Sequence, residues 1–282
     1  MTESASLPSP PAAAQTDDHV FAAWAATVAG DLLTEVRAQG LEGRALKDAG
    51  DQAAHDLLME LCARHRPGDA VMSEESRASI DDTDRLDAAR VWIIDPLDGT
   101  REFSEPPRDD WAVHVALWQR SGSGSGGSGT SGSSRGSDGD LVAGAVAQPG
   151  LRTTFDTGHP PLVPPRSAER PRIAVSRTRP PTFVEGLADA LGADLVPMGS
   201  AGAKVISVVR DVTDAYVHAG GQYEWDSAAP VAVARAAGLH TSRIDGSPLL
   251  YNQRDVLLPD LVVCRPELAD AILEHIRAAG VE

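Results

Sequence analysis

The chain of 282 residues is long enough for one large domain or two modest ones with a substantial core. Its 25 Lys and Arg residues and 41 Asp and Glu residues give a formal net charge of −16, which argues against a general nucleic-acid surface, because a duplex requires a basic face. The sequence has no apolar run of about twenty residues, and its N-terminus has neither the basic segment nor the apolar core of a signal peptide, so we expect a cytoplasmic protein. Two cysteines, Cys62 and Cys264, are too few for a disulfide framework or a thiolate metal cluster.

The N-terminal part of the chain predicts a tail and two helices. Residues 1–16 are rich in Ser, Pro and Ala, so we expect a disordered tail. An apolar pattern with helical spacing then covers about residues 17–40. A second helix is predicted over about residues 49–64, with Asp51 in its first turn, where the helix dipole favours a carboxylate.

The stretch VWIIDPLDGTR at residues 91–101 carries two carboxylates out of a buried strand. Its β-branched and aromatic residues predict a strand that ends at Asp95. Pro96 cannot continue the ladder and Gly99 permits a positive φ, so a sharp turn should bring Asp95 and Asp98 together. Adjacent carboxylates repel each other. Protonation of one acid would relieve this repulsion, and so would Mg²⁺ held together with a substrate phosphate.

An anion site is predicted beside these acids. Thr100 should open a short helix, so that the N–H groups of Gly99, Thr100 and Arg101 could face a phosphate. Upstream, the apolar stretch AVMSEE ends in the acids Glu74 and Glu75. Taken alone, DPLDG is explained equally well by a common turn on an acidic surface.

A β-hairpin is predicted in the middle of the chain. Residues 112–118 and 141–147 have the alternating pattern of paired strands. A Gly/Ser-rich segment at residues 121–139 separates them, and we interpret it as a flexible loop with nothing to bury. His114 lies inside the first strand, and we interpret it as a structural histidine.

The second half of the chain alternates strands and helices. We interpret the Pro-rich residues 159–171 as the boundary between an N-terminal α+β domain (17–165) and a C-terminal α/β domain (166–282). The predicted elements are strands at 172–176, 195–198 and 213–218, and helices at 181–191, at 204–210 and from Asp226 to about Gly238. The glycines of GSAGAK, at residues 199–204, allow a ligand to approach closely or the chain to turn tightly.

Three separated motifs together resemble one enzyme family. SEE at residues 73–75, WIIDPLDGT at 92–100 and WD at 225–226 match the Mg²⁺-dependent, lithium-sensitive phosphatases of the inositol monophosphatase superfamily in order and spacing. DPLDGTREF, GSAGAK and GGQYEWDSAAP are most similar to the CysQ-type 3'(2'),5'-bisphosphate nucleotidases. The resemblance implies an α/β fold of the αβαβα sandwich type, with the active site between its two halves.

The resemblance also implies roles for the matching residues. Two or three Mg²⁺ ions would be held by Glu74, Asp95, the Leu97 carbonyl, Asp98, Asp226 and, for a third ion, Asp51. The catalytic residues would be Glu74, Thr100 and Asp95, with Glu74 and Thr100 orienting and deprotonating the attacking water. The substrate would contact Leu97, Asp98, Gly99, Thr100, Arg101, Ser200, Lys204 and Asp226. Helix-end electrostatics remains an alternative for Asp51, and plain exposure to solvent remains one for Lys204.

The predicted function is hydrolysis of a phosphate monoester. The resemblance favours release of the 3'-phosphate from 3'-phosphoadenosine 5'-phosphate, with the corresponding sulfate as a further candidate substrate. The alternatives are an inositol monophosphatase, a fructose-1,6-bisphosphatase and a non-catalytic metal-binding regulatory protein. We expect a small phosphorylated molecule as the partner, and neither a nucleic-acid polymer nor a membrane. A homodimer is compatible with the sequence.

Overall fold

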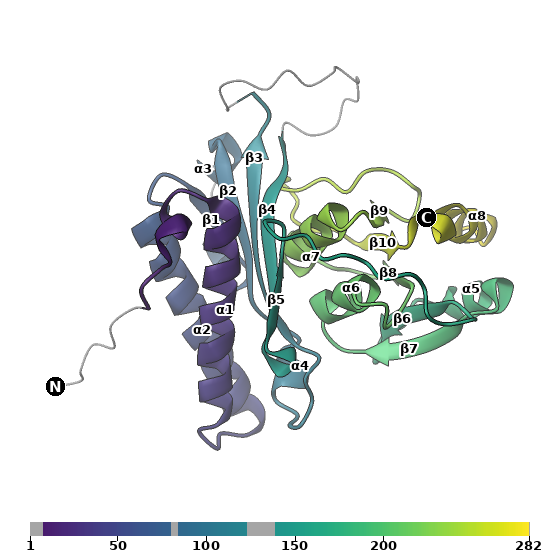
Figure 1. Cartoon of the computed structure of the whole chain (residues 1–282), viewed down its shortest axis with the longest axis horizontal. Coiled ribbons are helices and arrows are strands. Elements are labelled where there is room, and N and C mark those ends of the chain that lie inside the picture. Colours follow the sequence, from purple (N-terminus) through teal and green to yellow (C-terminus); the bar gives the residue numbers. More distant parts are fainter. Residues whose placement is uncertain (1–7, 80–83, 123–138, 282) are drawn as a thin grey trace.

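The computed structural model describes residues 8–79, 84–122 and 139–281, and it arranges helices and sheets in alternating layers (Figure 1). A pair of long helices covers the first sheet, a second pair lies between the two sheets, and a third pair covers the second sheet. Each sheet has five strands. The αβαβα sandwich implied by the family resemblance is confirmed.

The first sheet has the strand order β1-β2-β3-β4-β5. Its strands are β1 (Ala70–Ser73), β2 (Arg90–Asp98), β3 (Ala112–Arg120), β4 (Gly139–Gln148) and β5 (Thr153–Asp156). β1 and β2 are parallel, and the other neighbours are antiparallel. Successive side chains of β2 point to opposite sides of the strand, and both sides are buried. Trp92 and Ile94 belong to the core under the outer helices, whereas Val91 and Ile93 belong to the core between the sheets.

β2 contains a bulge at the point where its acids lie. Asp95 pairs with His114 and Asp98 pairs with Ala112, so β2 has one more residue than β3 over this interval. Residues three apart in a regular strand face opposite sides, and the extra residue cancels this alternation. Our prediction that the strand ends at Asp95 was therefore wrong, since it continues to Asp98. The positive φ predicted at Gly99 is confirmed, with a value of 84°.

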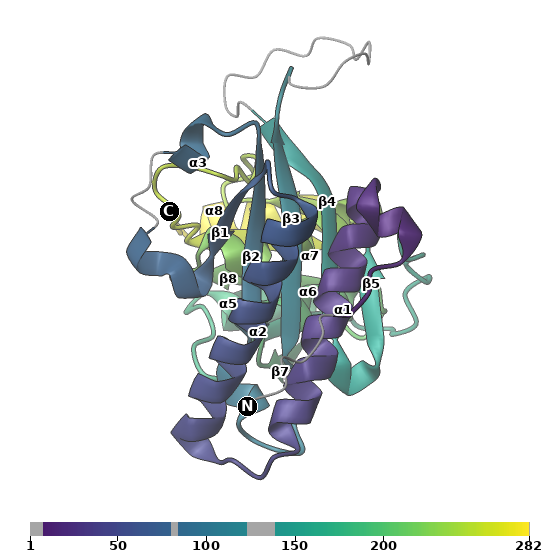
Figure 2. The ribbon, with the colours of Figure 1, turned by 90° about the vertical axis from the view of Figure 1, so that its left-hand side faces the viewer.

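Two long helices cover the outer face of the first sheet (Figure 2). α1 (Asp18–Arg37) is capped by Asp17, whose side chain accepts hydrogen bonds from two backbone N–H groups of the first turn. α2 (Gly43–His65) begins earlier than predicted, because Glu42 at its start makes no side-chain cap that would mark the boundary. Asp51 therefore lies in the third turn of α2, and its predicted position in the first turn was wrong.

The predicted disorder of residues 1–16 is wrong for Ala12–Gln15. Ala12–Gln15 forms the 3₁₀ helix η1, in which Ala14 is buried. The Ala14 carbonyl accepts a hydrogen bond from Arg66 of the segment that follows α2. Residues 1–7 lie outside the described part of the chain, as do residues 123–138 of the predicted flexible loop, so the prediction for these residues stays untested.

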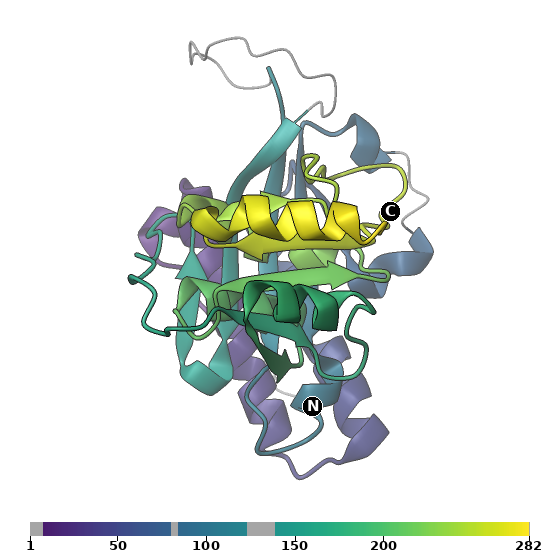
Figure 3. The same cartoon turned by 90° about the vertical axis from the view of Figure 1, so that its right-hand side faces the viewer.

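The second sheet has the strand order β7-β6-β8-β10-β9 (Figure 3). Its strands are β6 (Arg172–Ser176), β7 (Asp194–Met198), β8 (Ala215–Ala219), β9 (His240–Ser242) and β10 (Asp260–Cys264). β6 is parallel to β7 and to β8, whereas β10 is antiparallel to β8 and β9. The predicted strands at 172–176, 195–198 and 213–218 thus correspond to real strands.

The remaining helices complete the layers. α6 (Ala201–Val209) and α7 (Glu224–Ala236) lie between the sheets, and α5 (Val184–Leu191) and α8 (Ala269–Ala278) cover the outer face of the second sheet. α6 begins at Ala201 and not at Lys204 as predicted. Shorter elements are η2 (Glu74–Ser79), α3 (Asp84–Asp87), α4 (Thr100–Phe103), η3 (Pro149–Leu151) and η4 (Pro266–Leu268). Within the described residues, no helix has the length and apolarity needed to cross a membrane. The domain boundary in the Pro-rich segment stays a prediction.

Deletion of residues 123–138 should leave the fold and phosphate release almost unchanged. Arg120 and Gly139 are paired across β3 and β4, so Ser121 and Gly122 can form a two-residue hairpin connection between them. The cost of closing a loop changes by only about 0.6 kcal/mol per doubling of its length. Thermal melting and phosphate-release assays on both chains check this expectation. A folded deletion protein without activity would show that the segment takes part in function.

Candidate active site

Three carboxylates converge between the two sheets. Asp95 and Asp98 come from the bulged end of β2, and Asp226 comes from the first turn of α7. One oxygen of each lies within 4.8 Å of the others. The backbone N–H of Tyr223 donates to the Asp226 carboxylate at 2.6 Å, so the start of α7 fixes this side chain. The structure therefore brings together three of the residues that we predicted as metal ligands.

Glu74 joins this cluster from the end of β1. Its carboxyl group lies within hydrogen-bonding range of Asp95. Burial and the nearby charge of Asp226 raise the pKa of Glu74 to about 7. Burial and the charges of Glu74, Asp98 and Asp226 raise the pKa of Asp95 well above its usual value. Without a counter-charge, these two groups would therefore hold protons near neutral pH.

Asp98 differs from its neighbours because hydrogen-bond donors surround it. The Ser200 hydroxyl donates to it at 2.5 Å, and the backbone N–H groups of Ala201 and Gly202 donate at 3.1 and 2.7 Å. Burial alone would raise the pKa of Asp98, but the charge and hydrogen bond of His114, together with the Ser200 hydrogen bond, lower it to about 2. Asp98 therefore stays ionised, and it attaches the start of α6 to β2.

The burial of His114 agrees with its interpretation as a structural histidine, but its contact with the carboxylate cluster was not predicted from the sequence. His114 is fully buried on β3, with Nε2 3.2 Å from the Asp98 carboxylate and Nδ1 3.2 Å from the Trp225 carbonyl oxygen. A side chain at Gly202 would collide with the imidazole ring, so the glycine allows α6 to pack this closely. In the sequence, His114 is recognisable only as one ionisable residue in an apolar strand. Its position beside the carboxylates follows from the pairing of Asp95 with His114 across β2 and β3, which the sequence does not give.

Asp51 approaches the site from α2. Its Oδ1 lies 3.5 Å from the Thr100 hydroxyl, which also donates to the Leu97 carbonyl oxygen at 3.2 Å. Burial and the charge of Glu75 raise the pKa of Asp51 to about 7, against a weaker opposite effect of the Thr100 hydrogen bond. Because Asp51 lies inside α2, helix-end electrostatics does not explain its position.

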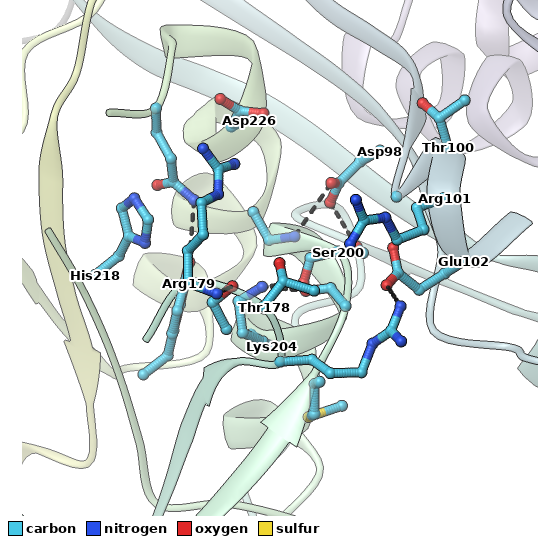
Figure 4. Close-up of a pocket in the computed structure, with 18 of the residues that line it drawn as sticks. Asp98, Thr100, Arg101, Glu102, Thr178, Arg179, Ser200, Lys204, His218 and Asp226 are labelled. Atoms are coloured by element: carbon cyan, nitrogen blue, oxygen red, sulfur yellow. Dashed lines mark hydrogen bonds and ion pairs between the residues drawn. The ribbon is translucent and has the colours of Figure 1, made fainter. Parts of the chain in front are cut away.

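A cavity of about 610 Å³ opens beside the carboxylates (Figure 4). Asp98 and Asp226 line it together with Arg101 and Arg179, two exposed cationic side chains. Gly99 also lines the cavity, and a side chain there would crowd Ser200 and the backbone that precedes β3. The volume is in the range of small-molecule sites, about 300–1,000 Å³. The cavity therefore suits a small anion in an otherwise acidic protein.

Ser200 and Lys204 lie at the cavity wall but also make internal hydrogen bonds. The Ser200 hydroxyl accepts from the Ala203 N–H at 2.9 Å and so caps α6. The Lys204 ammonium donates to the carbonyl oxygens of Gly199 and Ser200, and burial lowers its pKa. An ammonium has three N–H groups, so one remains for a ligand. The alternative that Lys204 simply faces solvent is wrong, because it is 4% exposed.

The oxygen groups at this site fit a hard divalent cation. Carboxylates and a carbonyl are the ligands that Mg²⁺ prefers. The Oδ2 atom of Asp95 is buried and has no hydrogen-bond partner of normal geometry among the described residues. A cation would provide the missing partner and would remove the repulsion that raises the pKa values of Asp95 and Glu74.

Comparisons with known proteins place this site in a family. The sequence model of the inositol monophosphatase family matches residues 17–125 and 137–280. This chain belongs to the inositol monophosphatase family. The 3'-phosphoadenosine 5'-phosphate phosphatase of Mycobacterium leprae (strain TN) is 49% identical over 271 residues, which cover 94% of this chain and 95% of the relative.

More distant proteins are also similar to this chain in sequence or in structure. The 3'(2'),5'-bisphosphate nucleotidase CysQ of Escherichia coli (strain K12) is 26% identical over 220 residues, which cover 74% of this chain and 81% of the relative. Inositol monophosphatase-II from Staphylococcus aureus MSSA476 has a similar structure, with a TM-score of 0.71 and 20% identity. That match covers 93% of this chain and 96% of the other, and it supports the fold.

Asp95→Asn should abolish phosphate release while the protein stays folded. The substitution removes a charge that other carboxylates repel, so the metal-free protein should melt at the same or a higher temperature. The loss of a shared metal ligand should lower the rate at least about a hundredfold. Melting curves in EDTA and phosphate release with Mg²⁺ provide the two measurements. Near-parental turnover in this variant would refute the metal-site hypothesis.

The metal-free protein should lose stability as pH rises from about 6.5 to about 8. Glu74 and Asp51 have pKa values raised to about 7, so the folded state holds protons that the unfolded chain has already released. Because the folded state binds more protons, its free energy of unfolding falls as pH rises through this range. His218, whose pKa is lowered to about 4, and Lys204, whose pKa is lowered by burial, act in the opposite direction, so the effect of the carboxylates is measured as the difference between the parental protein and a carboxylate variant that retains both.

Melting temperatures in EDTA across this pH range measure the effect. Glu74→Gln should make the pH dependence weaker, and saturating Mg²⁺ should do the same in the parental protein, because each removes a proton-binding carboxylate from the folded state. The exposed Glu60→Gln on α2 is the matched control and should keep the parental slope. An unchanged slope in Glu74→Gln would contradict the assignment of the titrating group.

Proposed function

We propose that this protein is a Mg²⁺-dependent 3'(2'),5'-bisphosphate nucleotidase that releases the 3'-phosphate of 3'-phosphoadenosine 5'-phosphate. This proposal rests on one observation: Asp95, Asp98 and Asp226 converge beside a cavity that also contains cationic side chains. The 49% identical relative that spans nearly the whole chain, and is named for this substrate, supports the choice within the family.

The proposed metal ligands are oxygen groups from four separate elements. They are Glu74 at the end of β1, Asp95, the Leu97 carbonyl and Asp98 on β2, Asp226 on α7 and, for a third ion, Asp51 on α2. When bound, Mg²⁺ would polarise the phosphate and offset the charge that develops on the leaving oxygen. The raised pKa values of Asp95, Glu74 and Asp51 mark positions where negative charge needs a partner.

Glu74 and Thr100 are proposed to hold the attacking water. Glu74 reaches the cluster from β1, and Thr100 from the first position of α4, so the two side chains reach the site from different elements. With cations bound, the repulsion that raises the pKa of Glu74 would be offset, so that Glu74 would be ionised and able to accept a proton from that water. The Leu97 carbonyl and Asp51 orient the Thr100 hydroxyl. The backbone of Gly99, Thr100 and Arg101, which lines the cavity, is proposed to hold the scissile phosphate.

The second phosphate of the substrate is proposed to contact cationic side chains away from the carboxylates. The remaining N–H of Lys204 is one candidate donor. Arg179 is another, since it lines the cavity and its side chain makes no ion pair within the described ranges 8–79, 84–122 and 139–281. Inositol monophosphates lack this second phosphate, so these contacts would favour a bisphosphate.

3'-Phosphoadenosine 5'-phosphate should have a higher kcat/KM than myo-inositol 1-phosphate in a Mg²⁺-supplemented assay, and EDTA should abolish both activities. One charge-assisted contact is worth about 1.5–3 kcal/mol. Lys204→Ala should therefore lower kcat/KM for the bisphosphate about tenfold or more and affect inositol phosphate far less. The exposed Arg44→Ala on α2 serves as the control with parental kinetics.

Two outcomes would change this assignment. A preference of the parental protein for inositol phosphate would make it an inositol monophosphatase. Equal losses on both substrates in Lys204→Ala would mean that Lys204 acts through the Gly199–Ser200 turn, and so through Asp98, and not on the second phosphate.

A further inference from the structure

Two side chains on one wall of the cavity carry buried polar atoms without partners. His218 on β8 and Gln222, which follows that strand, are each 8% exposed, and both line the cavity. In the described part of the chain, both ring nitrogens of His218 and the Oε1 atom of Gln222 lack a hydrogen-bond partner of normal geometry. Buried polar atoms are rarely left in this state, because each loses its hydrogen bonds to water. Their position at the cavity therefore points to a ligand that completes them.

A hydrogen bond fixes the Gln222 side chain through its amide nitrogen, while the amide oxygen Oε1 has no hydrogen-bond partner among the described residues. Its Nε2 atom donates to the hydroxyl of Tyr216 at 3.0 Å. Tyr216 is fully buried on β8, so the amide is anchored at this end. The other end, the Oε1 atom, can accept a hydrogen bond from a ligand in the cavity.

The His218 ring can present both a donor and an acceptor. Burial and the nearby positive charges of Lys204 and Arg179 lower the pKa of His218 to about 4, so the imidazole is neutral near pH 7. A neutral imidazole has one N–H group and one bare nitrogen. The Gly221 carbonyl approaches the ring but does not complete a hydrogen bond of normal geometry. In Figure 4, His218 lies on the side of the cavity away from Asp98 and Thr100.

We propose that His218 and Gln222 recognise the edge of the adenine base, so that they determine which nucleotide the site accepts. This inference rests on the proposed nucleotidase function and adds a base-reading subsite to it. Adenine presents an amino donor next to a ring-nitrogen acceptor. The amino group donates to Oε1 of Gln222, and the N–H of His218 donates to the ring nitrogen. Two of the three orphaned atoms, Oε1 of Gln222 and the N–H nitrogen of His218, thereby gain partners that neither an inositol ring nor a simple sugar arranges on one planar edge.

Inosine 3',5'-bisphosphate provides the sharpest comparison. Hypoxanthine has nearly the same shape as adenine, but it replaces the amino donor by a carbonyl acceptor and carries a hydrogen on the adjacent nitrogen. The carbonyl oxygen of hypoxanthine would therefore face the Oε1 atom of Gln222, and two acceptors cannot form a hydrogen bond. The parental protein should have a kcat/KM for the adenosine bisphosphate about tenfold or more above that for the inosine bisphosphate, since a site built to pair a substrate N–H rejects an analogue without it.

Two variants assign this preference to the named residues. Gln222→Leu and His218→Phe remove the polar atoms with little change in volume, and each should bring the ratio of the two kcat/KM values to within about threefold of one. The exposed Gln39→Leu after α1 is the matched control and should keep the parental ratio. The comparison of the two nucleotides on the parental protein needs no variant, so it holds even where a substitution impairs folding.

The outcomes separate the two proposals. Efficient and equal turnover of both nucleotides by the parental protein would overturn base recognition and leave the phosphatase assignment standing. A parental ratio that persists in both Gln222→Leu and His218→Phe would also overturn it. Absence of Mg²⁺-dependent phosphate release from either nucleotide would overturn the nucleotidase function together with the inference that rests on it.

Discussion

Electrostatic repulsion among buried carboxylates is the constraint on which the rest of this structure depends. Like charges at this distance disfavour each other strongly when they are withdrawn from water, and several of these groups respond with raised pKa values. Such a cluster persists only if the surrounding fold holds it in place. Here the β2 bulge turns Asp95 and Asp98 toward one side, and both faces of β2 are buried in apolar cores. Packing of the sheet thus stabilises a site that its own charges destabilise.

The site also joins the two halves of the molecule. Asp98 belongs to the first sheet, yet it accepts hydrogen bonds from the start of α6, which packs on the second sheet. Across the cavity, Arg177 after β6 pairs at 2.5 Å with Glu102 of α4. These contacts link the relative placement of the two sheets to the geometry of the carboxylate cluster. Loss of the Arg177–Glu102 pair would therefore change the site without altering any of the clustered carboxylates.

Patterns within short segments of the sequence correctly predicted those features of the structure that depend on neighbouring residues alone. The strand before Asp95, the hairpin of β3 and β4, and the positive φ of Gly99 follow from residue type and alternation, and the structure has all three. The start of α2 was missed because Glu42 gives no capping signal. His114 and the burial of Lys204 were missed because both depend on contacts between segments far apart in the chain. Strand register and helix docking decide such contacts, and neither is written in a short motif.

The two proposals place chemistry and specificity on different elements of this fold. The carboxylates lie on the β1 end, β2 and α7, whereas the orphaned polar atoms lie on β8 and the turn that follows it. In the proposed function, bound Mg²⁺ would meet only the scissile phosphate, which nucleotide and inositol substrates share, so it would not distinguish between them. Discrimination must come from groups that meet the rest of the molecule, and a buried polar atom discriminates best because it is costly to leave unpaired. We therefore expect substitutions at β8 to alter the choice of substrate while the carboxylate cluster, and the reaction proposed for it, stay the same.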